Sequence, residues 1–88
     1  MKISRNFVLK KIGDESVVIP LGSEAINLGG VLTLNETGVM LYEMLKDNKE
    51  ILELVDALVE AYNVSREQAM NDVLEFIEKL KELGILDV

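Results

Sequence analysis

Strand-like and helix-like sequence meet in one segment, VLTLNETG at residues 31–38. Upstream of it, short apolar runs alternate with glycine-containing breaks, which is typical of antiparallel strands. Downstream, apolar residues recur at the helical period of 3.6, and Asn35 can cap a helix over residues 36–45. The segment therefore predicts a sheet that ends at Leu34, followed by helices.

The first predicted hairpin consists of two runs, residues 7–12 and 16–21. Between them lies Gly13-Asp14, a dipeptide that favours a type II′ turn. In the second run, Val17, Ile19 and Leu21 fall on one face at the strand period of two.

A second hairpin is predicted where residues 25–28 and 31–34 flank Gly29-Gly30. The segment 31–34 completes a set of three main antiparallel strands. Residues 25–28 add a short extra strand at most.

Two further helices are predicted over residues 50–62 and 66–83. Asn63, in the left-handed conformation, is expected to end the helix over residues 50–62. A capping box of Ser65 with Gln68 should begin the helix over residues 66–83, and Gly84 should end it. For the helix over residues 36–45, a capping box of Thr33 with Glu36 competes with the Asn35 cap. Strands followed by helices indicate one α+β domain over residues 1–88, with the helices on one side of the sheet.

The third predicted helix is apolar over a wide arc. Eight apolar residues cover roughly 180° of its surface, whereas one packed face needs about 100–120°. They are Ala69, Met70, Val73, Leu74, Phe76, Ile77, Leu80 and Leu83. Either this helix contacts both the sheet and a neighbouring helix, or one margin of the arc lines an open groove.

The charge of the chain restricts its partners. Sixteen acidic and nine basic residues give a net charge of −7, and four of the bases fall within the first eleven residues. Nucleic acids and anionic membranes both attract bases, so we expect neither as a partner. The sequence shows no apolar run of about 20 residues and no secretory signal, and it has no cysteine, which favours a cytoplasmic location.

Side chains for catalysis and metal binding are scarce. The chain has no histidine and no cysteine, which are the commonest catalytic bases, nucleophiles and metal ligands. Its carboxylates follow the spacing of solvated helix faces, and no calcium-loop pattern occurs. We therefore expect no enzymatic activity, no metal and no cofactor.

Several short motifs together resemble the PqqD-like family, named for pyrroloquinoline quinone biosynthesis protein D. The most specific motif is LNETG at residues 34–38, with Tyr42 one turn later. The others are AYNV at 61–64, the pairs at 72–73 and 76–77, and LGIL at 83–86. The resemblance extends from about residue 7 to residue 86.

The resemblance implies a winged helix-turn-helix-like fold, with a small three-stranded antiparallel sheet followed by three helices. It implies a non-catalytic domain that binds the leader segment of a ribosomally made precursor peptide. The domain presents that peptide to a modifying enzyme, often a radical adenosylmethionine enzyme with an iron–sulfur cluster. The leader is expected to add a strand along the third strand and to lie against the third helix. The implied peptide-binding residues are Val31, Leu32, Thr33, Leu34, Asp72, Glu75, Phe76 and Lys79.

Strand addition has a physical basis, because an edge strand offers unpaired N–H and C=O groups to any extended peptide. Specificity then depends on side chains. Phe76 can receive an apolar side chain of the leader, and Asp72 and Glu75 favour a base. Phe76 can equally be a core residue, and the core is the expected place of Leu34.

Two other functions fit the same pattern. A structural module can use the open sheet edge to pair with a second copy, which gives a homodimer. A winged-helix DNA-binding protein is the other alternative, although residues 66–83 carry five acids against three bases.

Overall fold

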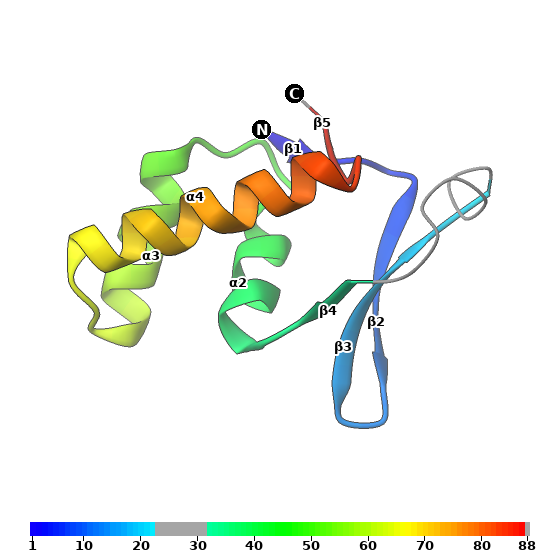
Figure 1. Cartoon of the computed structure of the whole chain (residues 1–88), viewed down its shortest axis with the longest axis horizontal. Coiled ribbons are helices and arrows are strands. Elements are labelled where there is room, and N and C mark those ends of the chain that lie inside the picture. The colour runs from blue at the N-terminus through cyan, green and yellow to red at the C-terminus, as the bar shows by residue number, and fades with distance from the viewer. Residues whose placement is uncertain (23–31, 88) are drawn as a thin grey trace.

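The computed structural model describes residues 1–22 and 32–87 and has the predicted α+β architecture (Figure 1). In chain order, the elements are β1 (Lys2–Ile3), β2 (Phe7–Ile12), β3 (Glu15–Pro20), β4 (Leu32–Leu34), α2 (Glu36–Met44), α3 (Ile51–Tyr62), α4 (Arg66–Glu82) and β5 (Leu86–Asp87). A three-stranded antiparallel sheet is thus followed by three helices, as expected. Val31, Gly29-Gly30 and the predicted extra strand at 25–28 lie outside the described residues.

The three main strands form an antiparallel sheet in the order β2-β3-β4. Gly13 has a φ of 63°, and Asp14 is not among the residues with positive φ, so the turn has the φ pattern of type II′. The hairpin tip, residues 10–15, is exposed and projects away from the helices like a wing (Figure 1).

β3 has buried side chains on both of its faces. Val18 is fully buried in the main core, between Leu9 of β2 and Leu32 of β4 in the strand register. Val17, on the opposite face, is also buried. Leu21, which shares the period of Val17, follows the strand and is exposed.

The helices begin and end within one or two residues of their predicted limits. Asn35 is the N-cap of α2, so the competing capping box of Thr33 with Glu36 is wrong. Ser65 caps α4, but the Gln68 side chain bonds to Asp72 and does not complete a capping box. The left-handed Asn63 and the positive φ of Gly84 are confirmed. An additional capping box, Glu50 with Glu53, begins α3.

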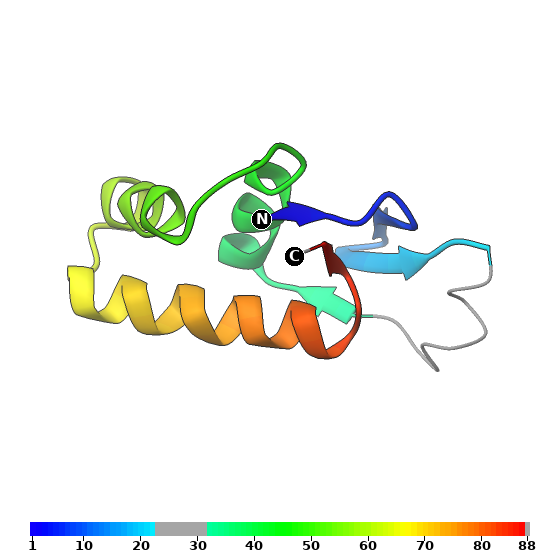
Figure 2. The ribbon, with the colours of Figure 1, turned by 90° about the horizontal axis from the view of Figure 1, so that it is seen from above.

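A second, two-stranded sheet joins the two ends of the chain, and the sequence did not predict it. β1 pairs antiparallel with β5, so that Ile3 lies opposite Leu86 (Figure 2). The N–H of Ile3 donates to the carbonyl oxygen of Leu45 at 2.8 Å, and that of Ser4 donates to Ile85 at 2.7 Å. These bonds fix the first residues against α2 and the end of α4.

The core lies between the sheet and the helices. Tyr42, Leu45, Leu54, Leu58 and Leu80 are among its largest fully buried side chains. α3 packs on α4, and an exposed ion pair of 2.6 Å between Arg66 and Asp56 links the two helices. Within the described ranges, none of the helices is both long and apolar enough to cross a membrane.

Candidate functional site

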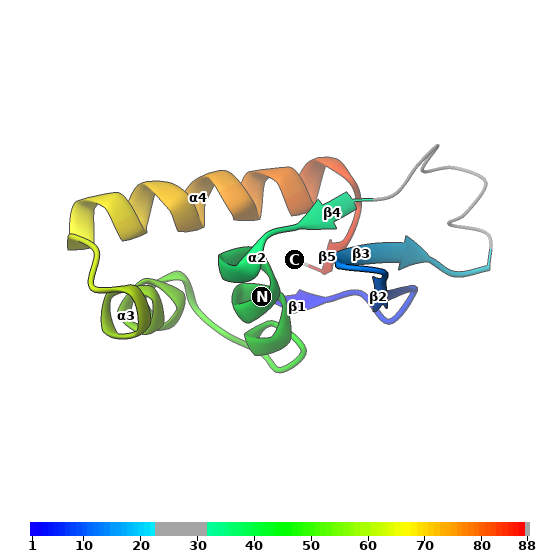
Figure 3. The same cartoon turned by 90° about the horizontal axis from the view of Figure 1, so that it is seen from below.

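A groove of about 930 Å³ separates β4 from α4, which run side by side in Figure 3. The groove is open to solvent. Fourteen residues from β4, the start of α2, α3 and α4 line it. They are Leu32, Thr33, Leu34, Asn35, Thr37, Gly38, Leu41, Leu58, Asp72, Glu75, Phe76, Glu78, Lys79 and Glu82.

β4 forms the first wall of the groove. It is the last strand of the sheet order, so its outer edge is unpaired among the described residues. Leu34 is buried, Leu32 is half-buried and Thr33 is exposed, which is the alternation of a strand with one face on the core. The N–H and C=O groups that face outward from β4 are therefore available to another extended chain.

The floor of the groove is apolar. Leu34, Leu41 and Leu58 reach it from β4, α2 and α3, and all three are nearly inaccessible to solvent. Phe76 of α4 packs against the core but keeps part of its ring exposed. The groove thus offers a hydrophobic surface next to an open strand edge.

α4 forms the second wall, and this wall is acidic. Asp72, Glu75, Glu78 and Glu82 line it together with a single base, Lys79. None of these five side chains takes part in the three ion pairs formed among the described residues. Asp72 accepts a hydrogen bond from Gln68 Nε2 at 2.8 Å, which holds its carboxylate on the helix surface. A base on a bound chain would therefore meet carboxylates that form no ion pair among the described residues.

Gly38 brings the start of α2 close to β4. A Cβ atom at this position would lie 3.2 Å from Asn35 Oδ1 and 3.3 Å from Leu34 Cβ, tighter than ordinary van der Waals contact. The glycine of the LNETG motif is thus explained by close packing at the end of the groove.

The structure brings seven of the eight predicted site residues together around this groove. Leu32, Thr33, Leu34, Asp72, Glu75, Phe76 and Lys79 all line it, while Val31 lies outside the described residues. Their role in peptide binding stays a prediction. Phe76 lies at one margin of the apolar arc of α4 and is half-buried. This agrees with the interpretation in which that margin lines a groove.

Sequence reasoning missed other lining residues, chiefly Leu41, Leu58, Glu78 and Glu82. The two leucines gave no signal, because they look like ordinary core residues of their helices. Glu82 follows Glu75 by seven residues, a spacing that returns to the same helix face. Glu82 could therefore have been predicted from the sequence as a lining residue.

The arrangement is suited to binding. Among the described residues, no three His, Cys, Asp or Glu side chains are placed to hold a metal ion. What the groove combines is an open strand edge, an apolar floor and a charged helix. These are the parts used when an extended peptide is added to a sheet.

Fold and groove define a small winged helix-like domain with an open sheet edge. The family model for coenzyme PQQ synthesis protein D (PqqD) matches residues 15–86, and the chain therefore belongs to the PqqD family. No curated protein matched the chain.

Two solved structures are similar over nearly the whole chain. TbiB1 in complex with the TbiA(beta) leader peptide is 33% identical, covers 99% of this chain and 100% of its own, and has a TM-score of 0.73. Lasso peptide synthetase B1 complexed with the leader peptide is 20% identical, covers 96% of this chain and 93% of its own, and has a TM-score of 0.76. At 20% identity the second match shows the shared fold alone.

Proposed function

We propose that this chain is a non-catalytic, cytoplasmic recognition domain for the leader segment of a ribosomally made precursor peptide. The leader adds to the outer edge of β4 and lies against α4. The bound precursor is then presented to a modifying enzyme. A radical adenosylmethionine enzyme is the partner that the family resemblance favours.

The observation that carries the proposal is the groove itself, which joins an open strand edge to a helix wall. The 33% identical relative, TbiB1, has been solved with a leader peptide, and its chain is covered completely by this one. All the described site residues that were predicted from the family resemblance converge on this groove.

The dimensions of the groove suit a short extended segment. From Asp72 to Lys79, α4 rises by about 10 Å, at roughly 1.5 Å per residue. An extended chain covers that length with about three residues, at roughly 3.3 Å each. This matches the three residues of β4, so backbone pairing and side-chain contacts can act on the same part of the leader.

Charge and apolar surface then set the preference among leaders. The apolar floor favours one or two hydrophobic anchors, and the acidic wall favours a basic residue beside them. The same wall opposes the DNA-binding alternative, because the phosphates of a duplex would approach four carboxylates and one lysine.

Amide chemical-shift mapping tests the proposal. The labelled chain is titrated with the synthetic leader segment of a candidate precursor peptide, and with a scrambled leader of the same composition. We expect shifts at residues 32–38 and along the groove side of α4 with the native leader only. Shifts confined to the outer face of α3 would defeat the proposal.

Pairing with a second copy uses the same β4 edge and is a competing use of the site. Sedimentation with and without the leader separates the two. If the chain self-associates through β4, the leader should dissociate the dimer.

A further inference from the structure

A second hollow, of about 380 Å³, lies between the N-terminal segment, the start of β2 and α2. It shares no lining residue with the groove between β4 and α4, which we call the leader groove. In Figure 3, β1 and β2 lie on the side of the molecule away from α4. Its lining consists of Lys2, Ile3, Ser4, Arg5, Phe7, Val8, Leu9, Tyr42 and Lys46, and we call it the basic hollow.

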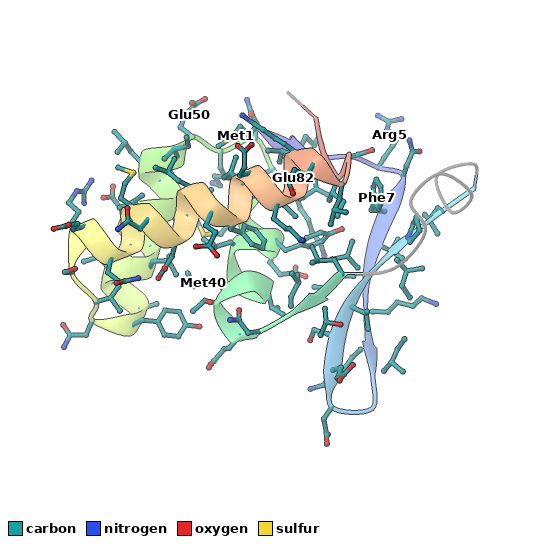
Figure 4. The ribbon with its side chains drawn as sticks, viewed as in Figure 1. Met1, Arg5, Phe7, Met40, Glu50 and Glu82 are labelled. Carbon is teal, nitrogen blue, oxygen red and sulfur yellow. The ribbon has the colours of Figure 1, made fainter. Side chains whose placement is uncertain are left out.

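The charge of the basic hollow is opposite to that of the chain as a whole. Lys2, Arg5 and Lys46 line it and no acidic residue does, in a protein with a net charge of −7. Lys46 is paired with Glu43 at 2.9 Å, whereas Lys2 and Arg5 form no ion pair among the described residues. Arg5 lies in the turn just before β2, near Phe7 (Figure 4). Two of the four bases among the first eleven residues, Lys2 and Arg5, thus line the basic hollow, and none of the four lines the groove between β4 and α4.

Tyr42 adds a hydrogen-bond donor to this charge. Its side chain is 1% exposed and lines the basic hollow, and no described residue hydrogen-bonds its hydroxyl. Among the described residues, every side-chain polar atom that is fully buried has a hydrogen-bond partner. Burial, and to a smaller degree the neighbouring Glu43, raises the pKa of Tyr42, so the hydroxyl stays protonated at neutral pH. A buried donor that has no acceptor among the described residues is suited to an incoming acceptor.

We infer that the basic hollow is a second docking site, which binds a carboxylate side chain on an acidic, extended segment of a partner protein. Lys2 and Arg5 supply the complementary charge, and the Tyr42 hydroxyl donates to the carboxylate. Phe7, Val8 and Leu9 of β2 lie at the other edge of the sheet order, where no described strand pairs with them, so the segment can also bond to the β2 backbone. The two sheet edges therefore select chains of opposite charge, and both can be occupied together.

The test uses a blocked eight-residue peptide of alternating glutamate and valine, with the glutamine counterpart as its matched control. We expect the glutamate peptide to shift amides at residues 2–9 and 42–46. Tyr42→Phe keeps the ring and should weaken binding about tenfold to a hundredfold, the range expected for loss of one hydrogen bond to a charged group. Arg5→Glu should weaken it further. Lys81→Glu makes the same change of charge on α4, outside both hollows, and should have a smaller effect.

Three results would overturn the inference: equal binding of the glutamine peptide, equal losses in Arg5→Glu and Lys81→Glu, or tighter binding of a short DNA duplex at the same amides. Circular dichroism checks that each variant folds. Adding saturating leader should leave the shifts at residues 2–9 unchanged. A wild-type chain that fails to bind leader but binds the glutamate peptide would defeat the proposed function alone, so the two failures are distinguishable.

Discussion

Asn35 Oδ1 accepts a hydrogen bond of 2.9 Å from the backbone N–H of Gly38, in the first turn of α2. The same oxygen accepts the Thr37 hydroxyl at 3.0 Å. Asn35 directly follows β4, the strand that borders the groove. Its side chain therefore stabilises the turn from β4 into α2.

Replacement of this cap should lower stability by a measurable amount. For Asn35→Ala we expect the free energy of unfolding to fall by about 1 kcal/mol, the usual effect of losing an N-cap. Asn35→Ser keeps an acceptor at the cap and should retain most of that stability. Urea unfolding of the three proteins measures the difference, and an Asn35→Ala variant as stable as wild type would contradict the role of the cap.

The apolar floor predicts that Phe76 contributes to leader affinity. Phe76→Ala should weaken binding about tenfold, because the leader then loses roughly 1.4 kcal/mol of apolar contact. The matched control is Leu74→Ala on the opposite margin of α4, where Leu74 is 45% exposed and does not line the groove. Calorimetry on both variants is the measurement. Equal effects at the two positions would show that Phe76 acts only through the core.

The acidic wall predicts a salt-dependent preference for basic leaders. Asp72→Lys should weaken binding of a leader with a basic anchor about threefold to tenfold at low salt, and by less at 0.5 M salt, where charges are screened beyond a few ångströms. Glu60→Lys on α3 makes the same change of charge at an exposed position outside the groove. A loss in Asp72→Lys that salt leaves unchanged would argue for a steric effect.

The strand-addition model makes a prediction for the backbone of β4. Thr33→Pro leaves the core side chains of the strand in place, because Thr33 is exposed, but it removes one N–H and introduces a rigid ring. We expect leader affinity to fall at least about threefold, which corresponds to one hydrogen bond. Thr33→Val keeps the backbone donor and should bind normally. If the proline variant folds and binds as tightly as wild type, the leader does not pair with this strand.

Tyr42 should give the stability a dependence on alkaline pH. Its pKa is raised above the ordinary value of 10.0, mainly by burial. The folded state therefore holds the phenolic proton more tightly than the unfolded state. This contribution is complete below pH 10 and is lost as the pH rises through the folded pKa. Tyr42→Phe should reduce the loss of stability above pH 10. Urea unfolding at pH 8 to 11 measures it, and identical pH profiles would contradict the assignment.

The parts of the fold that the sequence predicted are those with local causes. Asn35, Ser65, Asn63 and Gly84 mark helix ends through their own backbone preferences, and each was found in its expected place. The Glu50 N-cap was missed because glutamate is rarely used at that position. The pairing of β1 with β5 was missed because two-residue strands at opposite ends of a chain leave no pattern in either segment.

Residue patterns and the family resemblance each predicted a different part of the candidate site. Residue patterns alone predicted a wide apolar arc on the third helix and a strand ending at Leu34. The family resemblance supplied the relation between the two. Neither could identify the basic hollow, since Lys2, Arg5 and Tyr42 come together only through the tertiary fold.

The pairing of β1 with β5 places Lys2 opposite Asp87, at about 5 Å, the usual distance between paired strands. A host protein could thus carry the whole domain as an insert in one of its surface loops, with both connections leaving from the same place. The leader groove lies between β4 and α4 and would remain accessible. A fusion through the first residue turns the Met1 ammonium group into an amide with one N–H, which can keep only one of its two bonds, to Asn48 at 2.6 Å or to the Lys49 carbonyl at 3.1 Å. Exchange of this domain between host proteins is therefore structurally undemanding.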